Sequence, residues 1–136
     1  MNDCLFCKIV AGKIPANKVY EDENVLAFLD IAPNNPGHTL AIPKKHYETY
    51  LDTPDETLGD LSVKIKKIAT GVKKATGAEG MNIFVNAHKA AGQIVPHLHV
   101  HIIPRYFSDN FKHWASKKYA EDEAEKIAEK IKEEIK

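Results

Sequence analysis

The stretch His97-Leu98-His99-Val100-His101-Ile102-Ile103 places three histidines at every second position, with aliphatic side chains between them. Successive side chains of a β-strand point to opposite faces of a sheet, so this spacing predicts three imidazoles in a row on one face and the aliphatic side chains on the other. One histidine on a strand is usually a hydrogen-bonded core or surface residue. Three in alternation favour a reaction site, because imidazole has an ordinary pKa near neutrality and can act as nucleophile, proton donor or metal ligand.

Length and composition limit the kinds of ligand that this chain binds. At 136 residues it fits one domain that needs no disulfide or metal in order to fold. Its 19 basic and 19 acidic residues cancel, so no overall field attracts nucleic acid or an anionic membrane, and we expect a small ligand. No apolar run approaches the roughly 20 residues of a membrane span, and the first residues lack the pattern of a signal peptide. We therefore expect a cytoplasmic protein.

Turn and helix signals indicate an α+β domain with an antiparallel sheet. Five short apolar or alternating runs predict strands, and a long amphipathic helix lies between the third and the fourth of them. Thr53 is the candidate N-cap of this helix, with Pro54 at its first position and Glu56 at the capping-box position, and Gly77 ends it. The expected strands span 19–21, 25–29, 39–42, 81–86 and 98–104, and a short N-terminal helix spans 5–11.

The end of the chain carries a second amphipathic pattern. From Ser116 onward, apolar residues recur at helical spacing among glutamates and lysines, namely Ala124, Ile127, Ala128, Ile131 and Ile135. We therefore expect one domain over residues 1–115 and a C-terminal amphipathic helix over residues 116–136 that packs on this domain or extends it.

Several separated motifs occur in one order and resemble those of the histidine triad (HIT) family of nucleotide hydrolases and transferases. They are Phe28-Leu-Asp-Ile31, Pro36-Gly-His-Thr-Leu-Ala-Ile-Pro43 with Lys44-Lys-His46 after it, and Gly92-Gln-Ile-Val-Pro-His-Leu-His-Val-His101. The resemblance is to the Hint-like branch of zinc-containing bacterial and archaeal members. It implies the HIT-like fold, a homodimer whose sheets join, and a nucleotide site on each protomer.

The resemblance also assigns unequal roles to the histidines. It implies that His99 is the nucleophile on the α-phosphorus and that the backbone carbonyl of His97 holds the other nitrogen of His99. A neutral imidazole held in this way needs no base before it attacks. His101, Gln93 and Asn86 are the candidate hydrogen-bond donors to the phosphate or the leaving group. His38 is expected to support the triad, because its counterpart in relatives without zinc contacts the first histidine. The expected catalytic set is therefore His38, His97, His99 and His101.

Asp30 is the expected partner of the ribose hydroxyls, because the family uses its matching aspartate in this way. The alternative is that Asp30 caps the turn that follows it. Apolar residues near the corresponding pocket are suited to sandwich a purine of AMP or GMP type, although core packing is the commoner fate of such residues. The expected nucleotide-binding set is Phe6, Ile9, Asp30, Ile31, Asn86, Gly92, Gln93, His99 and His101, with Ile14 and Phe28 as further pocket candidates.

Cys4 and Cys7 form a C-x-x-C motif with the spacing of zinc ligands on a tight turn. This motif alone is weak evidence, and two unligated cysteines are the alternative. The resemblance adds His46 and His97, which completes a Cys₂His₂ set. Four protein ligands leave no open position for water or substrate, so the expected Zn²⁺ is structural.

These features predict an enzyme that attacks the α-phosphate of nucleoside phosphoramidates or dinucleoside polyphosphates and releases a nucleoside monophosphate. A nucleotide-binding scaffold or regulatory protein with little turnover is the alternative. A His₃ zinc hydrolase is disfavoured, because three alternating imidazoles span about 13 Å, too far for all to reach one ion at roughly 2 Å.

Some residues depart from the family pattern or match none of its motifs. Ile94 stands where some eukaryotic members place a serine that contacts the phosphate, so that contact is absent. Trp114 resembles a C-terminal tryptophan that reaches the partner's active site in some relatives, and packing on its own domain is the favoured alternative. His88 and His113 match no motif and are expected on the surface.

Overall fold

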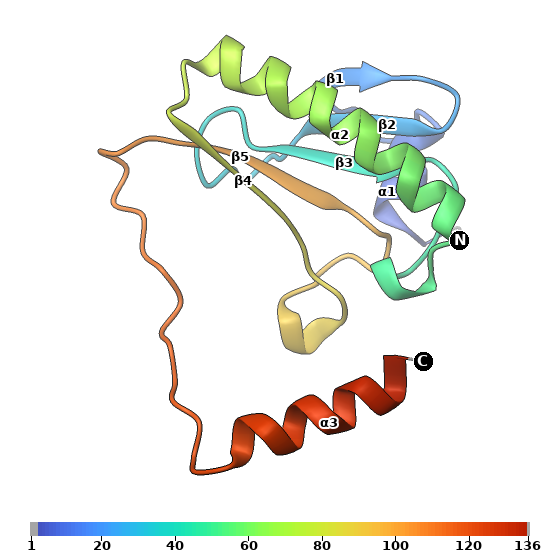
Figure 1. Ribbon diagram of the computed structural model, residues 1–136. Coiled ribbons are helices and arrows are strands. Elements are labelled where there is room, and N and C mark those ends of the chain that lie inside the picture. Colours follow the sequence, from blue (N-terminus) through green and yellow to red (C-terminus); the bar gives the residue numbers. More distant parts are fainter. Residues whose placement is uncertain (1–2, 136) are drawn as a thin grey trace.

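A five-stranded antiparallel sheet forms the centre of the computed structural model, which describes residues 3–135 (Figure 1). The spatial order of the strands is β1-β2-β3-β5-β4, so β4 and β1 are the edges. The α+β class and the five-stranded antiparallel sheet are thereby confirmed. The strands are β1 (Lys18–Glu21), β2 (Val25–Leu29), β3 (Thr39–Pro43), β4 (Gly80–Val85) and β5 (Val100–Arg105).

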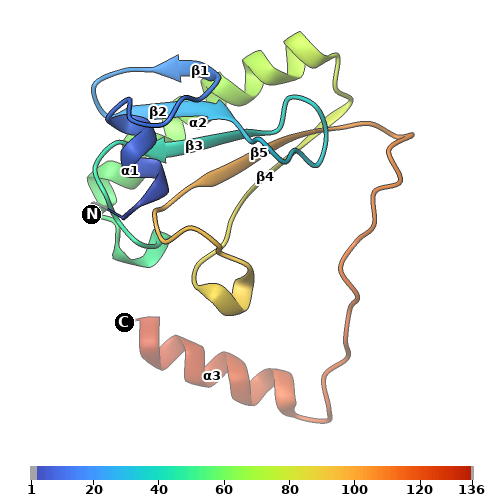
Figure 2. The same cartoon turned by 180° about the vertical axis from the view of Figure 1, so that it is seen from behind.

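Helices cover the two faces of this sheet unequally. The long helix α2 (Asp55–Thr76) packs on one face, and the short helix α1 (Leu5–Val10) lies on the other (Figures 1 and 2). The third helix, α3 (Glu123–Ile135), stands apart from both and begins later than the expected Ser116. Two short 3₁₀ helices, η1 (Tyr50–Asp52) and η2 (Lys89–Ala91), lie in the loops before α2 and after β4. Among the described residues, no helix combines the length and apolarity needed to cross a bilayer.

The histidine stretch joins β5 later than expected. Regular pairing begins at Val100, so His97, which lies in a bend, Leu98 and His99 precede the strand and are not part of it. The alternation of side chains holds nevertheless. Leu98 and Val100 belong to the core beneath α2, whereas the rings of His97 and His99 both meet the edge or face of Phe6 from α1. The three imidazoles therefore share the α1 side of the sheet although only His101 is in regular β-structure.

Helix α2 begins without the expected capping box. Pro54 is the N-cap residue, and its side chain makes no capping hydrogen bond. Thr53 lies one residue earlier, and its buried hydroxyl donates to the carbonyl of Thr49 at 2.8 Å. The C-terminal signal is confirmed, since Gly77 follows the helix with a left-handed φ of 70°. The cause of the first difference is that Thr53 lies one residue before the N-cap, where its hydroxyl donates to a carbonyl and its oxygen accepts no amide of the helix.

Gly37 precedes His38 in a turn that only glycine tolerates, and Gly37→Ala tests this constraint. Its φ is +99°, and an added Cβ would lie 2.8 Å from Cγ2 of Thr76 and 3.3 Å from Pro104. We expect the free energy of unfolding, measured in urea, to fall by about 2–4 kcal/mol from backbone strain and steric overlap together. Gly12→Ala is the matched control, because its φ is +77° with nothing within 4 Å, and it should lose only about 1 kcal/mol. Equal losses in the two variants would contradict a steric contribution at Gly37.

Candidate active site and metal centre

The nucleophile candidate His99 is held by one backbone hydrogen bond. Its Nδ1 lies 2.8 Å from the carbonyl oxygen of His97, and since a carbonyl only accepts, Nδ1 carries the proton. In the neutral ring the lone pair is therefore on Nε2. Burial lowers the pKa of His99 from its ordinary value, which favours this neutral form. The geometry thus places an unprotonated ring nitrogen at a fixed position.

His38 and His101 form a second chain of hydrogen bonds, and its direction follows from a backbone amide. The N–H of Asn34 donates to Nδ1 of His38 at 3.1 Å, so the neutral ring of His38 carries its proton on Nε2. This Nε2–H donates to Nδ1 of His101 at 2.9 Å. His101 is therefore left with its own proton on Nε2. His38 thus makes a hydrogen bond within the triad, as expected, but to the third histidine, because the Nε2–H of the first, His97, donates to the Pro43 carbonyl.

The ring of His101 is packed as well as hydrogen-bonded. Phe84 of β4 lies opposite it in the sheet register and stacks on it, with ring centroids 4.6 Å apart and planes 12° from parallel. Burial, and then the neighbouring His99 and His38, lower the pKa of His101 to about 4. The sequence did not lead us to predict a role for Phe84. The signal available for it was its position in the strand next to the histidine stretch. His101 is thus a neutral N–H donor at neutral pH.

Asp30 completes this cluster at the end of β2. Its Oδ1 accepts from the amide of Ala32 at 2.9 Å, which is the turn cap that was the alternative reading. Its Oδ2 lies 3.7 Å from Nε2 of His38 and makes no closer described contact. Although Asp30, His38 and His101 bring three ligand atoms within 4.8 Å, the Asn34 amide keeps the proton on His38 Nε2. We therefore interpret the trio as a hydrogen-bond network and not as a metal site.

An apolar pocket of about 270 Å³ adjoins His99 and His101 between α1 and the sheet. Phe6 and Ile9 line it from α1, and the fully exposed Ile31 lines it from the loop after β2. The remaining lining residues named from the sequence are Ile14, Phe28, Asp30, Gly92 and Ile94. The pocket combines flat apolar walls with the polar atoms of the histidine cluster, which suits a ring system attached to a polar group.

Two expected phosphate donors do not line this pocket. The amide of Gln93 is buried in its own loop, where Nε2 donates to the carbonyls of Glu48 and Val95 and Oε1 accepts from the amide of His88. Asn86 lies beside Gly92, whose added Cβ would be 3.6 Å from the Asn86 Nδ2. The structure therefore gives Gln93 the role of shaping the loop before the triad. The sequence predicted that Gln93 lies just before the triad. It did not predict the direction of the Gln93 side-chain amide, which depends on the shape of the loop.

Cys4, Cys7, His46 and His97 meet on the α1 side of the sheet, with their four ligand atoms within 4.8 Å of one another. Nδ1 of His97 lies 3.4 Å from Sγ of Cys4 and 3.2 Å from Nδ1 of His46. Sγ of Cys7 is 3.4 Å from His46 Nδ1 and 3.6 Å from His97 Nδ1. A tetrahedral Zn²⁺ with bonds of about 2.0–2.3 Å requires ligand atoms about 3.3–3.8 Å apart. The chain thus places two sulfurs and two nitrogens at spacings that fit zinc.

The protonation of this cluster also fits a metal centre. The Nε2–H of His97 donates to the carbonyl of Pro43 at 2.8 Å, which leaves the Nδ1 lone pair directed at the cysteines. Burial lowers the pKa of His97 to about 4, so the ring is neutral at neutral pH. Burial and the Cys4 thiol raise the pKa of Cys7 to about 11, and a bound cation would favour the thiolate instead. No other part of the described chain brings cysteines to a histidine pair.

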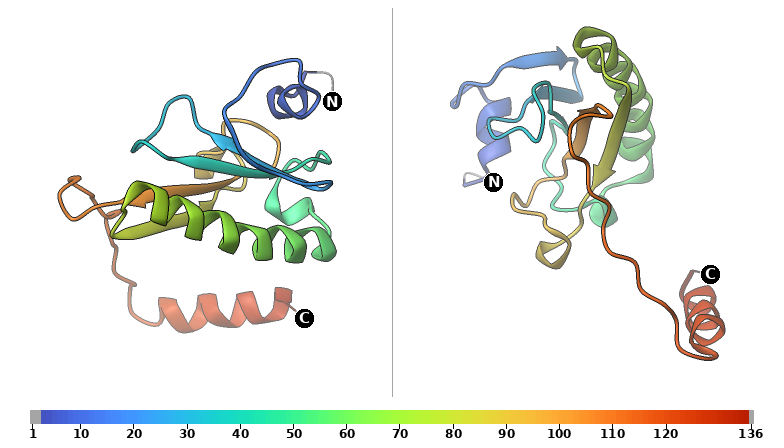
Figure 3. Two further views of the ribbon diagram at one scale, coloured as in Figure 1. Left: turned by 90° about the horizontal axis from the view of Figure 1, so that it is seen from above. Right: turned by 90° about the vertical axis from the view of Figure 1, so that its left-hand side faces the viewer.

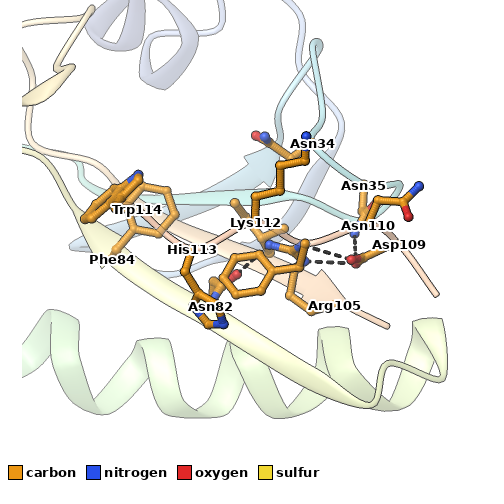
Figure 4. A pocket seen from close by; sticks show the side chains of 12 residues that line it. Asn34, Asn35, Asn82, Phe84, Arg105, Asp109, Asn110, Lys112, His113 and Trp114 are labelled. Atoms are coloured by element: carbon orange, nitrogen blue, oxygen red, sulfur yellow. Dashed lines mark hydrogen bonds and ion pairs between the residues drawn. The ribbon is translucent and has the colours of Figure 1, made fainter. Parts of the chain in front are cut away.

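A second pocket, of about 590 Å³, is lined by Phe84, Arg105 and Trp114 among others (Figure 4). Arg105 forms two hydrogen bonds to Asp109 there. Trp114 is 91% exposed, so the favoured expectation that it packs on its own domain is wrong. His88 and His113 are exposed, as expected.

A HIT domain model matches residues 11–108, and the chain belongs to this family. A crystal structure of a protein from Streptococcus mutans UA159 is 49% identical with a TM-score of 0.94, covering 100% of this chain and 87% of that one. Adenylylsulfatase HINT3 of Arabidopsis thaliana is 45% identical over 85% of this chain and 57% of that protein. A zinc-bound histidine triad protein of Mycobacterium smegmatis is 42% identical with a TM-score of 0.78, covering 86% and 85%. The family includes Hint-like proteins, nucleotide-binding proteins and at least one hydrolase.

The lowered pKa of His101 predicts how its ring titrates. Since the pKa in the folded protein is about 4 and the ordinary value is 6.5, unfolded chains bind this proton at pH values where the folded protein does not. The contribution of His101 to stability is therefore present above pH 6.5 and lost as pH falls from 6.5 towards 4. We expect NMR to show a neutral His101 ring at pH 5.5, with His113→Gln as the assignment control. A ring that is mostly protonated at pH 5.5 would contradict the burial argument.

Proposed function

We propose that this protein is a nucleotidyl hydrolase or transferase that attacks the α-phosphate of a nucleotide through His99 and releases a nucleoside monophosphate. The observation that carries this proposal is the 2.8 Å hydrogen bond from His99 Nδ1 to the His97 carbonyl, which leaves the Nε2 lone pair free beside the pocket. A neutral nucleophile with a fixed tautomer needs no base to activate it.

The reaction proceeds in two displacements. The lone pair of His99 Nε2 forms a bond to the α-phosphorus while the bond from phosphorus to the leaving group breaks. The ring of this nucleotidyl-histidine is cationic, and the His97 carbonyl stabilises its Nδ1–H. Water then attacks the phosphorus and loses one proton to solvent, the phosphorus–nitrogen bond breaks, and neutral His99 returns as the nucleoside monophosphate leaves. One difficult displacement becomes two easier ones.

His101 is the proposed donor to the phosphate oxygens or to the leaving group. The Asn34 amide and the Nε2–H of His38 fix its tautomer, so that its Nε2–H is the available group at the pocket. Its low pKa supports hydrogen-bond donation from a neutral ring, in preference to donation from a charged one. With Gln93 turned into its loop, His101 carries a larger share of this work than the family pattern implies.

The pocket between α1 and the sheet is the proposed purine site. Phe6, Ile9 and Ile31 supply apolar contacts for the base, and the second carboxylate oxygen of Asp30 is the proposed acceptor for the ribose hydroxyls. Phosphoramidates and dinucleoside polyphosphates are the proposed substrates, and the adenylylsulfatase relative adds adenylyl sulfate to the panel for assay. We further propose a homodimer in the cytoplasm as the working form.

The Cys₂His₂ cluster is the proposed site of a structural Zn²⁺. Its four ligands would occupy the coordination shell and tie the chain before α1 to the loop before β5. The same His97 that would bind the metal through its ring holds His99 through its carbonyl. The proposed zinc therefore positions the backbone of the nucleophile without contacting the substrate.

His99→Ala tests the chemical role of the nucleophile. We expect turnover of an adenosine phosphoramidate to fall by about 10⁴-fold or more, because no other group at the site can form the covalent intermediate. Nucleotide affinity should change by less than roughly tenfold, as measured by calorimetry. His88→Ala replaces an exposed histidine and is the matched control.

Acid quenching followed by mass spectrometry should find the nucleotide on His99 in the wild-type protein. Normal turnover by His99→Ala would refute the mechanism. Tight nucleotide binding by the wild-type protein, with neither turnover nor an adduct, would instead support a nucleotide-binding scaffold.

Removal of the proposed zinc should affect stability more than chemistry. We expect a chelator to release one Zn²⁺ per chain and to lower the Tm by about 10 °C or more, because metal-binding energy stabilises only the folded form. Zinc, but not Mg²⁺, should restore the Tm, and Cys4→Ser should behave like the metal-free protein. Single-turnover nucleotidylation in the protein that remains folded should slow only modestly. Its complete loss in folded metal-free protein would contradict a structural role.

A further inference from the structure

The two cysteines enclose two residues that belong to the wall of the apolar pocket. The motif reads Cys4-Leu5-Phe6-Cys7, and both Leu5 and Phe6 line the pocket that adjoins His99. The ring of Phe6 also meets the ring of His99 edge-on, with centroids 5.1 Å apart. A change in the covalent state of the two sulfurs therefore acts on the turn that carries this part of the wall.

The two sulfurs lie close enough to be joined by a small movement. Cys4 is the N-cap residue of α1 and Cys7 lies in its first turn, where the amide of Cys7 donates to Sγ of Cys4 at 3.4 Å. The sulfurs are 3.4 and 3.6 Å from the same atom, Nδ1 of His97. Since the ligand atoms of this cluster all lie within 4.8 Å of one another, a disulfide of about 2.05 Å requires the sulfurs to approach by less than about 3 Å.

Helix α1 lies where a small oxidant can reach it. Figure 3 shows α1 on the face of the sheet opposite to α2. The helix has six residues, and Phe6 and Ile9 are the side chains that it buries against the sheet. Cys7 is half-buried, whereas Cys4 is only 8% exposed. Cys7 is therefore the sulfur that an oxidant meets first.

We propose that Cys4 and Cys7 form a reversible disulfide when a hydroperoxide oxidises them, and that this disulfide weakens nucleotide binding in the pocket. The inference rests on the proposed function, because it concerns the regulation of the proposed nucleotide and zinc sites. A disulfide supplies neither of the two thiolate ligands, so only His46 and His97 would remain from the Cys₂His₂ set. Oxidation thus removes the metal ligands and alters the turn of the wall in one step.

The oxidation balances with one molecule of hydrogen peroxide. The sulfur of Cys7 attacks one peroxide oxygen, the oxygen–oxygen bond breaks, and a sulfenic acid forms while the other oxygen leaves as water. The sulfur of Cys4 then attacks the sulfur of Cys7, the sulfur–oxygen bond breaks, and a second water leaves. The two sulfurs lose the two electrons that the peroxide gains. An added dithiol reverses the reaction by thiol–disulfide exchange.

Thermodynamic linkage gives this coupling a reciprocal consequence. A nucleotide that binds the dithiol form more tightly than the disulfide form shifts the equilibrium between the two forms by the same factor. The pocket wall and the two cysteines share one turn, so nucleotide binding and disulfide formation require different geometries of the same backbone. Bound nucleotide should therefore protect the dithiol against oxidation.

The test compares three states of the full-length protein, namely zinc-loaded and reduced, metal-free and reduced, and peroxide-treated. We expect hydrogen peroxide to lower the mass by about 2 Da, to release Zn²⁺, and to raise the Kd of AMP in calorimetry by about tenfold or more. The metal-free reduced protein should keep its AMP Kd within about threefold, because its sulfurs are not joined. Dithiothreitol and Zn²⁺ together should restore the first state.

Cys7→Ser is the control for oxidation elsewhere in the chain. Peroxide should change the AMP Kd of this variant by less than about twofold, because no disulfide can form. A second measurement needs only the wild-type protein. In dithiothreitol redox buffers, saturating AMP should raise the ratio of dithiol to disulfide by the factor by which the two Kd values differ.

Three results would overturn the inference. A sulfinic acid or a disulfide between chains as the main product excludes the reversible disulfide, and an unchanged AMP Kd in the disulfide form excludes the coupling. An equal loss of AMP affinity in the metal-free reduced protein assigns the effect to the metal alone. Failure of AMP to bind the zinc-loaded protein refutes the proposed nucleotide site together with the coupling, and is thus distinct from a Kd that peroxide leaves unchanged.

Discussion

The structure depends on the hydrogen bond between the ring of His99 and the carbonyl of His97. A buried imidazole has two nitrogens and one proton when neutral, so whichever backbone group meets one nitrogen decides what the other can do. Here a carbonyl leaves the Nε2 lone pair of His99 free, the carbonyl of Pro43 leaves the Nδ1 lone pair of His97 directed at the cysteines, and the Asn34 amide, through His38, leaves the proton of His101 on Nε2. The backbone thus fixes the tautomers of three similar rings, and burial lowers the pKa of each.

The Cys/His cluster and the histidine triad share His97, and this residue joins the N-terminal segment to the site. Cys4 caps α1 by accepting from the amide of Cys7, and Phe6 on the same helix contacts both His97 and His99. The turn that would hold the metal therefore also sets the position of the pocket wall. A movement of α1 would change the metal cluster, the pocket and the nucleophile together. The cluster is separate from the apolar pocket between α1 and the sheet, but both share residues of α1.

The sequence was sufficient for those parts of the fold in which one local signal dominated. Alternation in the histidine stretch predicted that the imidazoles and the aliphatic side chains lie on opposite faces, and this holds even at His97 and His99, where regular pairing has not begun. Gly77 ended α2 as expected, because a left-handed residue satisfies the helix terminus. Prediction failed where a side chain had two possible partners. The Thr53 hydroxyl donates to a carbonyl of its own loop and does not accept from the helix amides, and the Gln93 amide donates to the carbonyls of Glu48 and Val95 and does not line the pocket.

The same reasoning explains why the neighbours of the triad were harder to find than the triad itself. Phe84 and the Asn34 amide reach the histidines only through strand order and loop shape, and neither residue type indicates chemistry on its own. Phe84 covers His101 because β4 is paired with β5 and places it directly opposite. β4 is also an edge strand of the sheet, and among the described residues β5 is its only partner strand. A displacement of β4 would therefore be transmitted to His101 through the ring of Phe84.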